Sequence, residues 1–462
     1  MNKKLLFTSI ALIISVLTSG FLSTKEPKRI EIPISRQRSG DPDKGFQYLI
    51  NGDYVSSGIP YNLASVFMPK DSSNVLNREG DSAFVSPTFN LVKHANGTRI
   101  LAPNCLTCHS DKINGEFIVG LGNNSFDYTI NTQGLTTMLD QFIKNRYSVE
   151  SKEYESFEQF KMASDALSNK IKTKVRGVNP ADKLTAVLVA HRNPVSLEWI
   201  KKSKLELPKE TIPTDVPAWW LLKKKNAMFS TGIGRGDFSR FLMASSLLTF
   251  KDTTEAAEID RHFPDVLAWI NTLESPKYPR SIDEELALKG RKLFDLNCST
   301  CHGTYGDNEK YPNLLISLEE VGTDPALSNA YTGGMYADFL EWYDKSWFTT
   351  GSTPGKVKVE GGYIAPPLDG VWATAPYLHN GSVPTIDVLL NSKSRPEYWA
   401  RSFNSNDYDM VNIGWLYEAL DTTQNSKTYD TTISGYSNTG HTFGDDLEDS
   451  ERMAVIEYLK TL

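Results

Sequence analysis

Apolar residues at helical spacing mark two regions in the last third of the chain. Residues 281–284 read Ser-Ile-Asp-Glu, a capping box that predicts a helix start at Ser281 with Glu284 three residues later. The helix that follows carries apolar residues three and four positions apart and leads to residue 298. A second run with this spacing ends the chain and contains Met453, Ile456, Tyr458 and Leu459. Gly290 lies on the first helix, and we expect it to let the two backbones approach closely.

The first half of the chain has a less regular pattern. Asp41 followed by Pro42 predicts another helix start, with aspartate as the cap and proline in the first turn. Helical spacing recurs in residues 149–171 and 240–273, so this half is rich in predicted helices. The proline-flanked segment 277–280 is the predicted linker to the second half. These patterns predict a mainly α fold.

The N-terminus has the pattern of an export signal. Lys3 and Lys4 precede an uncharged apolar run of 13 residues, 5–17, and small residues follow at 18–20. This run is shorter than the roughly 20 residues that cross a bilayer as a helix. We therefore expect residues 1–23 to be a signal peptide, and the mature protein to be soluble and periplasmic with no stable membrane span.

The four cysteines form two copies of one short motif. Residues 105–109 read Cys-Leu-Thr-Cys-His, and residues 298–302 read Cys-Ser-Thr-Cys-His. This pattern is the attachment site of a c-type haem, in which two thiols join the porphyrin and the histidine binds its iron. The alternatives are a zinc site built from both motifs together, or a pair of disulfides. We expect two covalently bound haems, with Cys105, Cys108, Cys298 and Cys301 as attachment residues and His109 and His302 as axial ligands.

Two cytochrome c-like haem domains are the predicted organisation. A helix that leads to the haem motif and a second helix that crosses it near the chain end form a cytochrome c domain, which we place at 281–462. The first haem domain would occupy 24–280. It is enlarged by long insertions, which a simple electron carrier does not need but an enclosed pocket over a haem would.

The remaining histidines are candidates for a second axial ligand. His441 lies between Gly440 and Thr442, with Gly444 close behind, in a loop ahead of the last helix, where glycines allow close approach to a flat porphyrin. Its alternative role is that of a surface-loop histidine. His379 fits a structural or haem-edge hydrogen-bonding role better than ligation. The sequence nominates no second ligand for the N-terminal haem, and an iron with an open position can bind peroxide or dioxygen.

Aromatic and basic residues of the first half are candidates for the pocket over that haem. Trp219 and Trp220 follow a proline and could form an apolar distal wall, with Arg235 as a polar group near a bound oxygen. Plain core packing explains the tryptophan pair equally well.

The charge of the chain bears on its partners. Its 462 residues leave room for two or three domains, and the net charge of −7 with no basic stripe argues against a nucleic-acid partner. We expect a small redox protein or another electron donor instead.

The chain resembles the bacterial di-haem cytochrome c peroxidase superfamily, and within it the branch that includes rubber oxygenase. Residues 373–381 are similar to the Thr-x-Pro-Tyr-x-His-Asp-Gly loop of the peroxidases, and residues 102–109, 216–220 and 234–237 are similar to the oxygenase branch. The resemblance implies a calcium ion near the carbonyls of Thr374 and Pro376, a histidine ligand such as His441 on the second haem, and an open N-terminal haem.

The sequence thus predicts a periplasmic di-haem oxidoreductase. The C-terminal haem would transfer electrons, and the N-terminal haem would carry out peroxide or dioxygen chemistry. The alternative is a non-enzymatic di-haem electron carrier or redox sensor.

Overall fold

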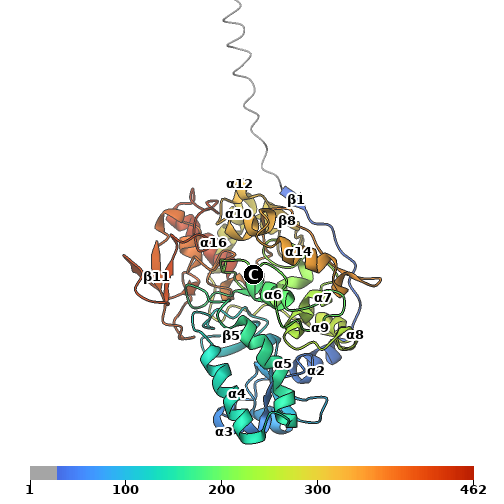
Figure 1. The fold of residues 1–462 in the computed structure, drawn as a ribbon. Coiled ribbons are helices and arrows are strands. Elements are labelled where there is room, and N and C mark those ends of the chain that lie inside the picture. The colour runs from blue at the N-terminus through green and yellow to red at the C-terminus, as the bar shows by residue number, and fades with distance from the viewer. Residues whose placement is uncertain (1–28) are drawn as a thin grey trace, which may run out of the picture.

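The computed structural model describes residues 29–462. The predicted signal peptide therefore lies outside the described residues. Figure 1 shows helices at both ends of the view, with α4 and α5 extending together at one end and α10 and α16 at the other. None of the helices within 29–462 has the length and apolar character needed to cross a membrane.

The prediction of a mainly α fold is wrong. The structure is 36% helical and 13% strand with several small sheets, so the fold is mixed α/β. The strands have two to five residues each, which is too short for an alternating pattern to stand out beside the longer helical runs. One of them, β3 (Phe89–Lys93), does alternate between buried and less buried residues.

The helices of the first half are α2 (Pro42–Asn51), α3 (Tyr61–Phe67), α4 (Gln133–Tyr147), α5 (Lys152–Leu167), α6 (Ala181–Ala190), α7 (Ser239–Leu242), α8 (Thr253–Asp260) and α9 (Phe263–Ile270). Those of the second half are α10 (Glu284–Asn297), α11 (Ser299–His302), α12 (Leu318–Val321), α13 (Ala326–Thr332), α14 (Ala337–Asp344), α15 (Ile386–Leu389) and α16 (Asp449–Leu459). Short 3₁₀ helices are η1 (Gly80–Phe84), η2 (Cys105–Thr107), η3 (Trp219–Lys224), η4 (Met243–Leu248), η5 (Trp347–Thr349), η6 (Val371–Ala373) and η7 (Ser392–Ser394).

The strands pair antiparallel in small separate sheets. The three-stranded sheets, in spatial order, are β1 (Arg29–Glu31), β8 (Leu314–Ile316) and β10 (Tyr363–Ile364); β2 (Ile59–Pro60), β4 (Arg99–Pro103) and β3; and β14 (Glu418–Leu420), β11 (Tyr398–Ala400) and β15 (Thr428–Asp430). The two-stranded sheets are β5 (Ser110–Ile113) with β6 (Glu116–Val119), β7 (Gly234–Gly236) with β9 (Gly355–Val357), and β12 (Tyr408–Asp409) with β13 (Gly414–Trp415). Because β1 and β7 pair with strands of the second half, the two halves of the chain are joined through sheets.

Both predicted helix starts correspond to helices, and one cap differs. Asp41 caps α2 as predicted, because its side chain accepts hydrogen bonds from the backbone N–H groups of Asp43 and Lys44. The cap of α10 is Asp283, which accepts from the backbone N–H of Leu286, so the predicted cap at Ser281 is wrong. The backbone N–H of Asp283 itself donates to Glu457 of α16 over 2.7 Å. This tertiary contact, which the local pattern does not contain, fixes the start of the helix.

The predicted close approach at Gly290 is confirmed. A Cβ atom on Gly290 would lie 1.8 Å from the backbone oxygen of Ala454 in α16. Helix α2 meets α9 in the same way, because a Cβ on Gly45 would lie 1.9 Å from the oxygen of Asp265. Each half of the chain therefore contains a helix crossing that only glycine permits.

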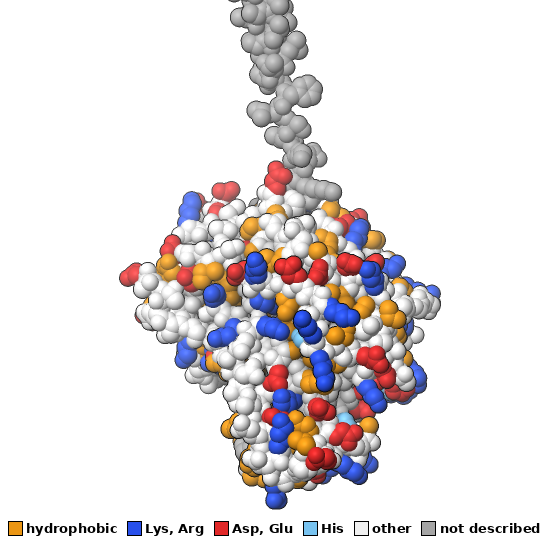
Figure 2. All heavy atoms as spheres, viewed as in Figure 1, with side chains coloured by type: hydrophobic (Ala, Val, Ile, Leu, Met, Phe, Trp, Pro, Cys, Tyr) orange, Lys and Arg blue, Asp and Glu red, His pale blue; other side chains and the backbone are white. Residues whose placement is uncertain are grey.

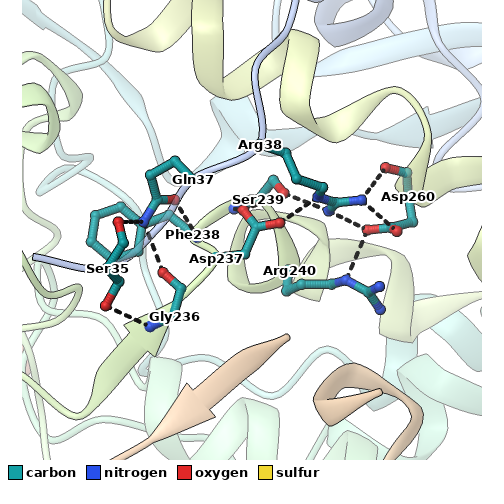
Figure 3. A network of polar contacts seen from close by, with 9 residues as sticks. All are labelled: Ser35, Gln37, Arg38, Gly236, Asp237, Phe238, Ser239, Arg240 and Asp260. Carbon is teal, nitrogen blue, oxygen red and sulfur yellow. Dashed lines mark hydrogen bonds and ion pairs between the residues drawn. The ribbon is translucent and has the colours of Figure 1, made fainter. Parts of the chain in front are cut away.

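The segment that follows β1 is held against residues 236–239 of the first half (Figure 3). The guanidinium of Arg38 donates to both carboxylate oxygens of Asp260 over 2.7 and 2.8 Å, to Ser239 over 2.7 Å, and also to Asp237. Gln37 donates to the carbonyl of Gly236 over 2.8 Å. On the outer surface, Figure 2 shows charges of both signs interspersed on the viewed face.

We predict that Gly290→Ala lowers the free energy of unfolding by about 1–3 kcal/mol, because the added methyl group forces α10 away from α16. Urea denaturation followed by circular dichroism measures the change. Gly134→Ala in α4 is the matched control, since nothing lies within 4 Å of a Cβ at that position. Equal losses in the two variants would contradict a specific close contact at Gly290.

Candidate haem sites

The second Cys-x-x-Cys-His motif follows directly from α10. Cys298 is the C-cap of α10, and the single turn of α11 brings the backbone N–H of His302 within 3.0 Å of the Cys298 carbonyl. The Nδ1 atom of His302 lies 2.8 Å from the carbonyl oxygen of Pro366. A bond from Nδ1–H to a carbonyl fixes the tautomer in which Nε2 is free to bind a metal.

A cavity of about 330 Å³ opens beside this motif. Cys298, Cys301 and His302 line it, and so does His441. Most of the other lining side chains are apolar, among them Leu221, Phe294, Ile316, Ile364, Ile386, Val455 and Leu459. An apolar cavity with a few converging polar groups is the usual form of a cofactor site.

The imidazole of His441 faces that of His302. Their ring centres are 6.1 Å apart, and the ring planes make an angle of 58°. Two imidazoles that bind one metal ion from opposite sides have ring centres roughly 6 Å apart, because each metal–nitrogen bond is about 2 Å long. The residues therefore fit a haem iron held between His302 and His441.

The loop that carries His441 is fixed by backbone contacts. The N–H of His441 donates to the carbonyl of Val321 over 2.7 Å, and the guanidinium of Arg395 donates to the carbonyls of Asn438, Gly440 and His441 over 2.6, 2.6 and 2.9 Å. Gly440 has a φ of +73°, and a Cβ there would lie 2.0 Å from the backbone of Gly322. Burial lowers the pKa of His441 to about 3, so its ring is neutral at neutral pH, as a metal ligand must be.

The first motif has the same local turn. Asn104 caps η2 by accepting from the N–H of Leu106, and the N–H of His109 lies 3.0 Å from the Cys105 carbonyl. The ring of His109 stacks on Trp219 with centres 4.5 Å apart and an angle of 21°. Burial lowers the pKa of His109 to about 3, and its Nδ1 atom is buried without a hydrogen-bond partner among the described residues.

The thiols bear on the alternatives to haem. All four cysteines are free, and burial raises their pKa values, that of Cys298 to about 12. Reactive dithiols have lowered pKa values instead. Cys105 packs in one hydrophobic core and Cys298 in another, which places the two motifs apart and disfavours one shared zinc site. Within 29–462 no group of three or more His, Cys, Asp and Glu side chains is placed to hold a metal ion.

The predicted distal residues have different positions. Trp219 lies beside His109 itself, whereas the indole N–H of Trp220 donates to the carbonyl of Asp369 over 2.8 Å, at the wall of the other motif's cavity. The guanidinium of Arg235 donates to the carbonyl of Gly232 over 2.6 Å and to Glu360 over 2.9 Å. A distal role for these residues stays a prediction.

The predicted calcium residues line the cavity of the second motif. The side chain of Thr374 donates to the carbonyl of Val371 over 3.1 Å. Between Thr374 and Pro376, the carbonyl of Ala375 accepts from Asn124 over 2.8 Å and from Trp415 over 2.9 Å. No carboxylate cage lies among the described residues. The calcium site stays a prediction that rests on the resemblance alone.

The cavity is also lined by His379, for which the sequence favours a structural or haem-edge role, and by two residues that the sequence analysis does not single out. His379 lines the wall, stacks on Tyr363 with ring centres 3.8 Å apart, and has its pKa lowered to about 3 by burial. Asp215 and Lys225 line the same cavity. No local motif marks Asp215 or Lys225, because their importance depends on the segments that surround them in space.

Comparison with known proteins supports a cytochrome c-like chain. Residues 362–400, which include the Pro366 carbonyl and the Thr374–His379 loop, match the family described as RoxA-like, cytochrome c-like. The chain is 30% identical over 253 residues to uncharacterized protein y4iJ of Sinorhizobium fredii, covering 41% of each chain. It is 28% identical over 283 residues to uncharacterized protein y4iM of the same organism, covering 54% of this chain and 62% of that one. The family match suggests a haem-binding redox protein with covalently bound haem c.

We predict that His379 makes the protein sensitive to acid. The unfolded chain binds a proton at this histidine below about pH 6.5, whereas the folded protein does so only near the lowered pKa of about 3. Stability is therefore lost as the pH falls, by about 2–3 kcal/mol from this residue between about pH 6.5 and 4.5. His379→Phe, which keeps a ring against Tyr363, should have a smaller pH slope in denaturant unfolding.

His262→Phe is the matched control, because His262 also stacks on a tyrosine, Tyr48, but has a side chain that is 43% exposed. Parallel stability curves for the wild-type protein and His379→Phe would contradict the prediction.

Proposed function

We propose that this protein is an exported, periplasmic di-haem c-type cytochrome that acts as an oxidoreductase. Cys298 and Cys301 would attach the C-terminal haem, with His302 and His441 as its axial ligands. Cys105 and Cys108 would attach the N-terminal haem, with His109 as its ligand. The observation that carries the proposal is the 6.1 Å separation of the two imidazole rings across the cavity.

The residues of the second motif favour electron transfer at that site. A bound haem would supply a one-electron iron couple there. The Pro366 carbonyl keeps His302 in a single orientation, and Arg395 fixes the backbone of the His441 loop. If His302 and His441 both hold the haem iron, no coordination position would remain for a substrate, and the fixed side chains would need little rearrangement when the charge changes.

The first motif supports the proposed peroxide or dioxygen chemistry. The motif contains His109, and the ring of this histidine is stacked on Trp219. No ring contact between His109 and a second histidine is found among the described residues. We infer that this site leaves one coordination position for peroxide or dioxygen, which an electron carrier does not need.

The segment between the two motifs gives a route for electrons. Trp219 contacts His109, and its chain neighbours Pro217, Ala218 and Leu221 line the cavity beside His302. A short covalent path therefore connects the surroundings of the two motifs. We propose that electrons pass along this segment between the haems and enter from a small redox protein or another donor.

The second candidate function is an electron carrier or redox sensor without catalysis. The paired histidines at the second motif favour it, because an electron carrier needs such a site. The two functions differ only in whether the N-terminal iron binds an external ligand.

The experiment that tests the proposal counts haems and probes open positions. Mass spectrometry should show two haems in the wild-type protein and one in a Cys298→Ser, Cys301→Ser variant. Cyanide or peroxide should then change the optical spectrum of both proteins, since the N-terminal site remains intact. A colourless exported protein would disprove haem binding, and spectra silent to both ligands would favour the carrier.

We predict that His441→Ala converts one of the two haems from low spin to high spin, because the variant loses one axial ligand. Electron paramagnetic resonance of the oxidised protein measures the change. His379→Ala, from the wall of the same cavity, should leave the spin states unchanged. The opposite pattern would assign ligation to His379.

A further inference from the structure

The charged side chains that line the cavity of the second motif differ in their pairing. Besides histidines, they are Arg29, Asp215, Lys225 and Asp369. Arg29 donates to Glu320 over 2.7 Å, and Asp369 accepts from Lys224 over 2.6 Å. The charges of Arg29 and Asp369 are therefore already balanced by protein groups.

Lys225 has no such partner. It follows η3, where its backbone N–H donates to the carbonyl of Leu222 over 3.1 Å, and the residue is only 9% exposed. The described residues place no carboxylate within 4.0 Å of its ammonium and no hydrogen-bond acceptor in reach. Burial lowers its pKa to about 8. A charge on a buried residue without a protein partner is costly, so an anion in the cavity would stabilise the ammonium.

Asp215 does not supply that anion. It makes no ion pair with Lys225, and its backbone N–H donates to the carbonyl of His379 over 2.7 Å. Burial raises the pKa of its carboxyl group well above the usual value, which favours the neutral acid.

We propose that Lys225 binds a propionate of the C-terminal haem and positions that haem in the cavity. The inference rests on the proposed function, because the propionates are the anionic groups that a haem at Cys298 and Cys301 brings with it. The ammonium then gains a counter-charge inside the cavity, and the propionate gains a hydrogen-bond donor. Lys225 is a positioning residue in this assignment, since it acts on the iron only through the porphyrin.

The pairing has a measurable consequence for the reduction potential. A positive charge near the haem disfavours the ferric form, which carries one more positive charge than the ferrous form. Lys225→Met removes that charge and leaves the propionate unbalanced. We expect the equilibrium constant for reduction of one haem to fall about tenfold, which corresponds to roughly 59 mV for a one-electron couple.

Spectroelectrochemical titration of the purified di-haem protein measures this shift. Lys223→Met is the matched control, because Lys223 lies two residues earlier, is exposed, and donates to Glu274 outside the cavity. It should leave both potentials unchanged. Lys225→Arg keeps the charge and should preserve the potential while altering the propionate bending modes in the resonance Raman spectrum. If Lys225→Met does not fold, the comparison of wild type with Lys225→Arg is used in its place.

The outcomes are distinguishable. Potentials and propionate modes that are the same in wild type, Lys225→Met and Lys225→Arg would overturn the inference and leave the proposed function intact. A wild-type potential that shifts with added phosphate, and no longer does so in Lys225→Met, would assign the cation to an external anion and also overturn it. Loss of haem from the wild-type second motif would overturn the proposed function itself.

Discussion

The close contact between α10 and α16 at Gly290 is the constraint on which the second site depends. Helix α10 ends at Cys298, so its position sets the thiols and His302. The loop that carries His441 leads directly into α16, so the same contact sets the opposite wall. Gly290 and Ala454 meet without intervening side chains. The positions of both proposed ligands therefore depend on one rigid pair of helices. Asp283 and Glu457 add a polar contact at the start of α10.

The first motif depends on a related arrangement. Helices α2 and α9 cross at Gly45 as α10 and α16 do at Gly290, and both motifs close the same turn from the cysteine carbonyl to the histidine N–H. The surroundings differ, however. The second cavity places an imidazole opposite its histidine, whereas Trp219 stacks directly on His109. One local motif in two different surroundings would account for the proposed division of work between two haems, which neither motif reveals by itself.

The sequence correctly predicted features that depend on local chemistry. Its predictions were wrong or missing for features that depend on contacts between distant segments. The cap at Asp41 and the contact at Gly290 follow from residue type and spacing. The mainly α prediction was wrong because many short strands pair across long stretches of chain, as β7 does with β9. Lys225 could not be identified from the sequence for the same reason. Its lack of a carboxylate partner depends on the side chains around it, which come from segments between residues 29 and 369.

The electrostatics of the second cavity follow from this packing. Burial favours the neutral forms of His302, His441, Cys298 and Asp215, because a low-dielectric wall penalises every charge that is not paired. Neutral imidazoles are the form that binds a metal, so the burial that shields the cavity also keeps its proposed ligands in the form that binds. Burial acts on Lys225 in the same direction, but it lowers the pKa only to about 8, so the ammonium stays the main form at neutral pH. A wall that suppresses other unpaired charges but retains one buried ammonium is suited to a ligand that is largely apolar and anionic at one edge.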